Sequence, residues 1–315
     1  MDINKLKKQI QSLSEEDRKK LLSDLHIEHY EKNDYVSKVQ KDKEIKTVLC
    51  CPHCSSNEFI SRGSHKSVKR YQCKNCKKYF NLNYKTALYR IHKKDKWQQY
   101  IECMNEGLSL RKAAEKVGIC YRTSFIWRHK ILSKLKEAEP SKLGGIVEVD
   151  DTYFPNSEKG NKSIKRKSRR RGDSRMINQK NKIPVVVATD RKGNTVLRVA
   201  GKGTLRRKAL QLQMSGKFDP DTILCSDGAL VYKGLADKEG IQWIKAAIHG
   251  RPVAKNKAYN IQSVNQLHKE LKQFMNRFNG VSTKYLQNYM FWFMQSKWKV
   301  SDNEKIKQWI WFTIT

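Results

Sequence analysis

Long apolar runs are missing from this sequence of 315 residues, and no uninterrupted apolar stretch is long enough to cross a bilayer. A secretory leader is missing as well, because the opening stretch MDINKLKKQIQSLSEEDRKK is too densely charged. These absences argue against a membrane-spanning protein, and we expect the chain to stay in the cytoplasm. Thiols are reduced there, so the eight cysteines do not predict disulfides.

Acidic residues are also scarce. The chain has 31 Asp and Glu against 65 Lys and Arg, which gives a formal net charge of +34. An excess this large opposes compact folding by self-repulsion, so a polyanionic partner is expected, with nucleic acid as the leading candidate. A membrane surface is the rival, but it would require an amphipathic basic helix. The hydrophobic content of 38% predicts a globular chain with two or three compact units.

Changes in pattern along the chain suggest five segments. Cysteines punctuate the first third, helical periodicity follows, and Pro140 with Gly144-Gly145 marks a boundary. Beyond that boundary, strand-like and helix-like runs alternate, which favours a mixed α/β domain. The predicted organisation is an N-terminal helical segment (1–45), a zinc ribbon (46–85), a helix-turn-helix domain (86–140), an α/β domain (144–300) with a basic insertion near 156–182, and a C-terminal tail (301–315).

Two C-x-x-C pairs predict a structural zinc site. The pairs are Cys51 with Cys54 and Cys73 with Cys76, and residues 55–72 separate them. Two tight turns at this separation supply the four thiolates that tetrahedral zinc requires. The alternative is four unrelated buried thiols. A site with four protein ligands leaves no position for substrate, so this zinc would stabilise a small module and take no part in catalysis.

The segment LSLRKAAEKVGICYRTSFIWRHKIL predicts a pair of helices. Small and apolar residues from Leu110 to Val117 share one helical face, and Gly118 permits a sharp turn. The second helix is expected to begin near Tyr121 and to be basic, as helices that read the major groove are. An ordinary helical hairpin with a solvated basic face is the alternative. The DNA-binding candidates are Arg122, Arg128 and Lys130, together with Arg169, Arg170 and Arg171 in the basic insertion.

Acidic residues interrupt two segments that otherwise resemble buried strands. The first is GIVEVDDTYF (145–154), and the second, 222–226, ends at Asp227. Further strands are expected at 183–189 and 195–200. An ionised acid in a strand is costly unless it is used, and paired carboxylates suit a hard divalent cation such as Mg²⁺. These acids therefore predict a metal site for phosphoryl transfer.

A helix near residues 264–272 supplies a third element. Val264, Leu267 and Leu271 form its core stripe. Asn265, His268 and Lys272 each follow one of these residues, so they share a face beside that stripe. Such a face could meet both aspartates across a cleft. The alternative for Asn265 is a hydrogen bond at a domain edge.

The motifs VEVDDTYF, CSDGALVY and VNQLHKELKQFMNRFNGVSTKYLQNYMFWF resemble those of the ISXO-like transposases of bacterial insertion sequences. Members of that family also begin with a zinc ribbon and a helix-turn-helix, and the segment at 108–132 is similar to theirs. The resemblance covers residues 50 to 298. It implies an RNase H-like catalytic core, a mixed sheet flanked by helices.

The resemblance also assigns roles to residues. By position in the motifs, Asp150 resembles the first acid, Asp227 the second, Asn265 the third metal ligand and Lys272 the basic residue that follows it. The wider transposase class has Glu at the third position. Asp151 is the second choice for the first acid. Glu270 is a weak substitute for the third ligand, because on a helix it faces roughly 140° away from Asn265.

The mechanism that the resemblance implies is two-metal phosphoryl transfer with Mg²⁺ or Mn²⁺. Water would cut each element end, and the freed 3′-hydroxyl would then attack target DNA in the same site. The expected partners are element ends and target DNA, with the protein acting as a homo-oligomer on DNA. Two alternatives remain: a DNA-binding regulator without catalysis, which leaves Asp150 and Asp227 without a purpose, and a structure-selective nuclease of the same fold.

Overall fold

The computed structural model describes residues 12–14, 16–17, 36, 39, 50–65, 68–164, 179–248, 251–252, 256–297 and 300–314. Nearly all of the predicted N-terminal helical segment and the basic stretch 165–178 lie outside these residues. The chain forms two compact units: one ends at Leu82 and also takes in His92–Gln98, and the other comprises Asn83–Ile91 and Gln99–Thr315. Within the described part of the chain, no helix is long and apolar enough to cross a membrane.

The first unit is built on a small antiparallel sheet. Its strands are β1 (Phe59–His65), β2 (Val68–Cys73) and β3 (Tyr79–Phe80), in the order β1-β2-β3. The rings of Phe59, Tyr71 and Phe80 pack against one another with centroids 5.3–5.8 Å apart. This aromatic cluster, with Cys51 and Cys73 beside it, forms the core of the small sheet. A core this small needs further stabilisation, which a bound metal provides in modules of this size.

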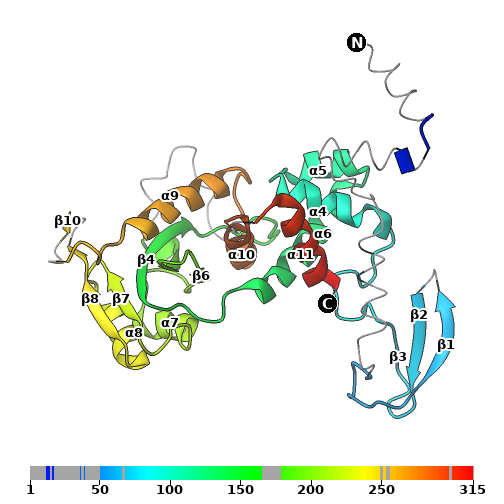
Figure 1. Cartoon of the computed structure of the whole chain (residues 1–315), viewed down its shortest axis with the longest axis horizontal. Helices are drawn as coiled ribbons and strands as arrows, with labels where there is room; N and C mark the ends of the chain where they lie inside the picture. Colours follow the sequence, from blue (N-terminus) through cyan, green and yellow to red (C-terminus); the bar gives the residue numbers. More distant parts are fainter. Residues whose placement is uncertain are drawn as a thin grey trace. The chain divides into compact units, whose positions relative to one another are not determined.

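The second unit contains a five-stranded mixed sheet (Figure 1) in the order β6-β5-β4-β7-β8. Strands β4, β5 and β6 are antiparallel neighbours, whereas β7 runs parallel to β4, and β8 parallel to β7. This topology is consistent with the predicted RNase H-like core. The four predicted strands are confirmed, with shifts of one residue at their ends: β4 (Ile146–Pro155), β5 (Lys182–Asp190), β6 (Thr195–Val199) and β7 (Ile223–Ser226). Strand β8 (Gln242–Lys245), at the edge of the sheet, was not predicted.

Helices cover both faces of the sheet. Helices α7 (Arg207–Met214) and α8 (Leu230–Glu239) lie on one face, and α9 (Gln262–Asn276) lies on the other (Figure 1). Val147 and Val149 of β4 belong to the apolar core on the α7 and α8 side. Because side chains alternate along a strand, Glu148 and Asp150 face α9. Short elements complete the sheet region: η4 (Gln179–Asn181), β9 (Ala247–Ile248) and β10 (Arg251–Pro252).

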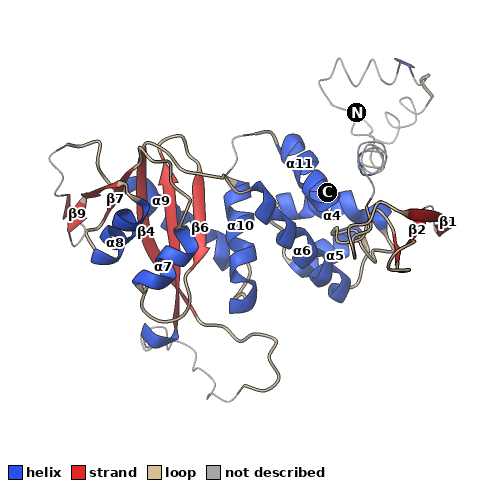
Figure 2. Cartoon of the chain, turned by 90° about the horizontal axis from the view of Figure 1, so that it is seen from below, coloured by secondary structure: helices blue, strands red, loops and turns tan. Residues whose placement is uncertain are grey.

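A helical group lies beside the sheet in the same unit (Figure 2). The predicted helix pair is confirmed: Ser109 caps the first helix, and Gly118, at φ 67°, ends it. The segment expected as a C-terminal tail contains a helix, in which Ile306, Trp309, Ile310 and Ile314 are buried and Trp311 is exposed. The elements are α4 (Trp97–Asn105), α5 (Leu110–Val117), α6 (Tyr121–Lys134), η2 (Leu135–Ala138), η5 (Thr283–Tyr285), α10 (Leu286–Ser296) and α11 (Asp302–Ile314). The short helix η1 (Lys94–Lys96) and the first two residues of α4 belong to the first unit.

Helix α10 joins the helical group to the sheet. The Gln287 side chain accepts a hydrogen bond from the Val199 amide (2.8 Å) and donates one to the Leu197 carbonyl (2.9 Å). These bonds satisfy backbone groups on β6, an edge strand that would otherwise offer them to another chain. Helix α10 also packs against α6 and η2. The helix pair and the sheet are therefore parts of one compact unit.

Candidate functional site

The two predicted aspartates are neighbours because of the register between β4 and β7. The parallel pairing joins Ile146 to Ile223 and Glu148 to Cys225. Continued by two residues, the same register sets Asp150 beside Asp227. Asp227 directly follows β7, and its Oδ1 accepts a hydrogen bond from the Ala229 amide (3.0 Å), which orients the carboxylate. The sheet thus brings together two acids that are far apart in sequence.

Asp150 lies in an environment that resists its ionisation. Burial is the main cause, and the charges of Asp151 and Asp227 add to it, so the pKa of Asp150 rises to about 7. An acid held in this way by burial and like charge binds a proton or a cation readily. The carboxylate pair therefore fits a positively charged group between its members.

Helix α9 places one residue of its polar face, His268, next to Asp150. His268 Nδ1 lies 3.8 Å from Asp150 Oδ2. Burial and the charge of Lys272 lower the pKa of His268 to about 4, so the ring is neutral at neutral pH. Asn265 and Lys272 are exposed, one turn before and one turn after His268. The predicted shared face of Asn265, His268 and Lys272 thus lies along the helix that packs over β4.

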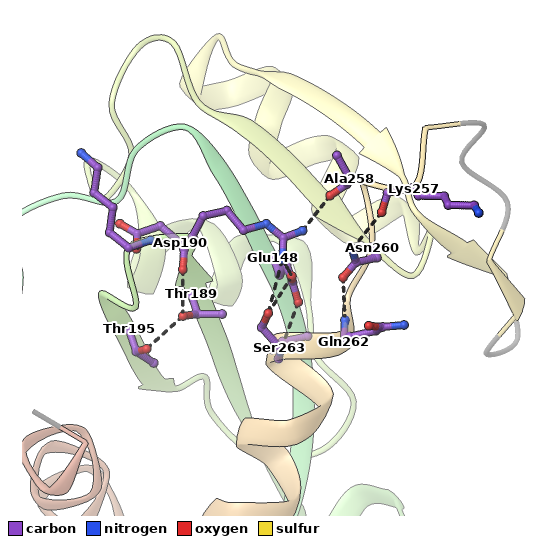
Figure 3. Close-up of polar contacts among 12 residues, drawn as sticks. Glu148, Thr189, Asp190, Thr195, Lys257, Ala258, Asn260, Gln262 and Ser263 are labelled. Atoms are coloured by element: carbon purple, nitrogen blue, oxygen red, sulfur yellow. Dashed lines mark hydrogen bonds and ion pairs between the residues drawn. The ribbon is translucent and has the colours of Figure 1, made fainter. Parts of the chain in front are cut away.

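A buried acid on β4 anchors the start of α9 (Figure 3). Glu148 is 1% exposed, and its two carboxylate oxygens accept hydrogen bonds from Ser263 Oγ and the Val264 amide, each at 3.0 Å. Arg191 completes the arrangement, with Nη1 2.5 Å from Glu148 Oε1 and Nη2 donating to the Ala258 carbonyl (2.7 Å). A carboxylate at a helix N-terminus satisfies free amides and complements the helix dipole. Glu148 therefore fixes α9 next to Asp150, two residues along the same strand.

The two alternative acids are engaged elsewhere. Asp151 Oδ1 accepts a hydrogen bond from the buried Tyr232 hydroxyl (2.6 Å), on the opposite face of the sheet from Asp150. Glu270 forms an ion pair with Lys297 and accepts a hydrogen bond from Gln266 (3.0 Å). These contacts favour Asp150 over Asp151 and Asn265 over Glu270 as members of the site.

The four predicted cysteines converge in the first unit. The ligand atoms of Cys51, Cys54, Cys73 and Cys76 all lie within 4.8 Å of one another, and two of the sulfur pairs are 3.5 Å apart. Four sulfurs bound to one zinc at 2.3 Å would be separated by about 3.8 Å, so the cluster fits that ion. The Cys76 amide, as a hydrogen-bond donor, contributes most to lowering the pKa of Cys73 to about 6. A lowered pKa favours the thiolate, the form that binds metal.

The predicted DNA contacts on α6 are only partly available. Arg122 is exposed. Arg128, by contrast, is 1% exposed, donates to the Leu108 carbonyl (2.7 Å) and lies over the Trp292 ring. The ammonium of Lys130 donates to the Ala87 and Tyr89 carbonyls. Arg128 and Lys130 thus help to hold the helical group together, and their contacts with DNA stay predictions. Arg169, Arg170 and Arg171 lie outside the described residues.

No role in the site was predicted from the sequence for Glu148, His268 or Arg191. Glu148 had a detectable signal, because it is an acid in a buried strand two residues before Asp150 and therefore on the same face. His268 was placed on the correct helix face, but its contact with Asp150 depends on the packing of α9. Arg191 had no signal, since it lies in a turn and reaches Glu148 only in the folded sheet.

Comparisons with known proteins agree with this geometry. Residues 142–294, from just before β4 to near the end of α10, match the family model of the ISXO2-like transposase domain. An uncharacterized protein in the transposable element ISH50 of Halobacterium salinarum is 25% identical over 248 residues, which cover 76% of this chain and 82% of the relative. That alignment is longer than residues 142–294, so the similarity extends beyond the matched domain.

The mixed sheet, with Asp150 on β4 and Asp227 directly after the neighbouring parallel strand β7, is consistent with a DDE-type transposase core. Within that class, residues 142–294 form an ISXO2-like transposase domain. The chain therefore carries an ISXO2-like transposase domain over just under half of its length, and it is a distant homologue of a protein from an insertion element.

Proposed function

We propose that this protein binds the ends of an insertion sequence, cuts them, and joins the 3′-hydroxyl ends to target DNA. The observation that carries the proposal is the register of β4 with β7, which sets Asp150 beside Asp227 inside a transposase domain. Asp150, Asp227, Asn265 and Lys272 are the proposed catalytic residues. A regulator that only binds DNA would have no use for two such acids, since burying them is costly.

The donor set of this site suits Mg²⁺ or Mn²⁺. Two carboxylates and one amide oxygen are hard oxygen ligands, which these cations prefer. Asp150, Asp227 and Asn265 would hold the cation, and the raised pKa of Asp150 supports a need for positive charge there. A bound divalent cation supplies Lewis-acid stabilisation of the charge that develops on the transferred phosphate. Asn265 is a neutral ligand and would contribute less than either aspartate.

The other residues of the site prepare it for a DNA strand. Lys272 is exposed on α9 and would hold a DNA phosphate as a point charge. His268 stays neutral beside Asp150 and so adds no charge that would compete with a cation. Glu148 and Arg191 keep α9 in position while the strand binds. In this proposal the same site serves first for cutting and then for joining.

DNA binding would rest on several basic segments. The net charge of +34 supports a polyanionic partner. Arg122 on α6 and the insertion residues Arg169, Arg170 and Arg171 are the proposed contacts. The four-cysteine cluster would hold a structural zinc that stabilises the small N-terminal unit. Because the two ends of an element must be cut and joined together, the proposed working form on DNA is a homo-oligomer.

Incubating the full-length protein with labelled element ends and target DNA distinguishes the three functions. A transposase gives nicked ends and joined products when Mg²⁺ is present, and neither product without added divalent cation. A nuclease gives nicks without joining, and a regulator gives binding alone. Asn265→Ala should reduce both products, whereas Asn265→Asp, which restores a charged oxygen ligand, should retain them. Binding without any nicking in Mg²⁺ would refute the proposed enzyme.

A further inference from the structure

A cavity of about 850 Å³ lies between the helix pair and the loop that joins α9 to α10. Its walls come from the start of α5, from the part of α6 between Tyr121 and His129, from Lys159 and Gly160 after β4, and from residues 277–282, 284, 285 and 289. All of these residues belong to one compact unit. Cavities of this size accept small molecules or single side groups of a larger ligand. The site is separate from Asp150 and Asp227, which do not line it.

The lining of this cavity is strongly basic. No Asp or Glu is among the lining residues, whereas six of them are cations: Arg111, Arg122, Arg128, Lys159, Arg277 and Lys284. Lys159 Nζ donates to the Gly280 carbonyl (3.1 Å), and the Lys284 ammonium lies 4.7 Å from the centre of the Tyr285 ring. Neither a carbonyl nor a ring neutralises a charge. The cavity therefore favours an anionic occupant.

Two lining residues carry polar atoms that lack a partner. Arg128 Nε and His129 Nδ1 are both buried without a hydrogen-bond partner in the described part of the chain. Burial and the charges of Arg128 and Lys284 lower the pKa of His129 to about 4, so its ring is neutral and can both donate and accept. Buried polar groups are normally satisfied, and those that are not call for a ligand or water. An occupant with a polar edge would satisfy both residues.

An aromatic ring with a free face completes the lining. Tyr121, the first residue of α6, is 54% exposed and lines the cavity. The Tyr285 ring is already stacked on His129, with centroids 3.8 Å apart. Exposed aromatic rings beside cations are the usual binding sites of unpaired nucleotides, because every base has a face for stacking and each phosphate is anionic. An acidic polypeptide would match the charge of the cavity. It would not explain the exposed ring of Tyr121 or the unsatisfied polar atoms of Arg128 and His129.

We propose that this cavity binds one unpaired nucleotide of a DNA strand, with its base stacked on Tyr121 and its flanking phosphates held by Arg111 and Arg277. The base edge would meet Arg128 and His129 at the floor. The proposal rests on the proposed function for the presence of DNA. Nucleotide binding in the cavity requires no chemistry at Asp150. The binding proposal and the proposed transposase activity can therefore fail independently.

The test uses a DNA hairpin with one unpaired 2-aminopurine, and the same hairpin with an abasic site at that position. Binding to the full-length protein is measured by anisotropy and base fluorescence in buffer without Mg²⁺. Loss of one stacked base should weaken binding about 5- to 150-fold. Tyr121→Ala should abolish this difference between the hairpins, and Tyr121→Phe should keep it. Ile126→Ala is the matched control, since Ile126 is exposed on the same helix and does not line the cavity.

Equal affinity of the unaltered protein for both hairpins would overturn the proposal, as would a base-dependent difference that survives Tyr121→Ala. If poly-glutamate displaces both hairpins alike and no base dependence is found, the cavity binds an acidic polypeptide instead. Cleavage is not measured here. A loss of the proposed catalytic function would therefore leave the result unchanged.

Discussion

Glu148→Gln is the most informative single change, because it removes the buried charge that anchors α9 and keeps the size of the side chain. Glu148 accepts hydrogen bonds from Ser263 Oγ and the Val264 amide and pairs with Arg191. Glutamine retains one acceptor oxygen, and Arg191 is 39% exposed, so water can solvate the released guanidinium. The expected loss is that of one hydrogen bond to a charged group, about 1.5–3 kcal/mol of unfolding free energy.

Urea denaturation measures this loss, and amide hydrogen exchange locates it. Exchange at the Val264 amide should accelerate about 10- to 100-fold, because the first turn of α9 opens more easily. Glu239→Gln is the matched control: Glu239 also accepts from a hydroxyl and an amide, those of Ser215 (2.6 Å) and Gly216 (2.9 Å), but outside the core. It should lose less than about 1 kcal/mol. Equal losses in the two variants, with unchanged exchange at Val264, would refute the anchoring role.

Three further predictions concern the rest of the molecule. Metal analysis should find about one zinc per chain, and zinc retained after Cys73→Ala plus Cys76→Ala would contradict the four-thiolate site. Arg122→Ala should weaken binding to element ends by about 1–3 kcal/mol and relax specificity, whereas an equal effect on random DNA would indicate a phosphate contact instead. The pKa of His129 falls from 6.5 to about 4 on folding, so the unfolded chain binds more protons and stability should decrease as the pH drops through that window. His129→Gln should flatten this decrease in thermal melts at pH 7 to 4, and an unchanged slope would show that His129 is not its source.

The sequence contained enough to predict four of the five strands of the mixed sheet and helix α9. Short apolar runs marked β4 and β5, and a 3.6-residue period marked α9. The acids could be identified because a carboxylate is out of place in an apolar strand. Their pairing was not predictable from these patterns, since it depends on the register of β4 with β7 across more than 70 intervening residues. Family resemblance supplied that pairing before the geometry was known.

The helix pair shows where pattern reasoning is limited. Helix α5 ends and helix α6 begins close to the predicted positions, because Gly118 is a local signal for the turn between them. The surroundings of α6 are not local: α10 and α11, from the far end of the sequence, pack against it. The sequence predicted that the basic residues of α6 would be exposed, but α10 and α11 cover part of this helix. The spacing of Trp127, Arg128 and Ile131 places Arg128 on the apolar face, and this spacing was the signal that was overlooked.

Strand joining by aspartate variants tests the central claim most directly, namely that Asp150 and Asp227 form the catalytic pair. The experiment measures joined products and DNA binding for the Asp150→Asn and Asp227→Asn variants. The control is Asp237→Asn, because Asp237 lies on the exposed face of α8. Loss of one negative ligand should abolish nicking and joining, while binding stays nearly intact because it rests on the basic surface. The control should remain fully active. Nicked or joined ends produced by either Asp150→Asn or Asp227→Asn at the control's rate would contradict the account.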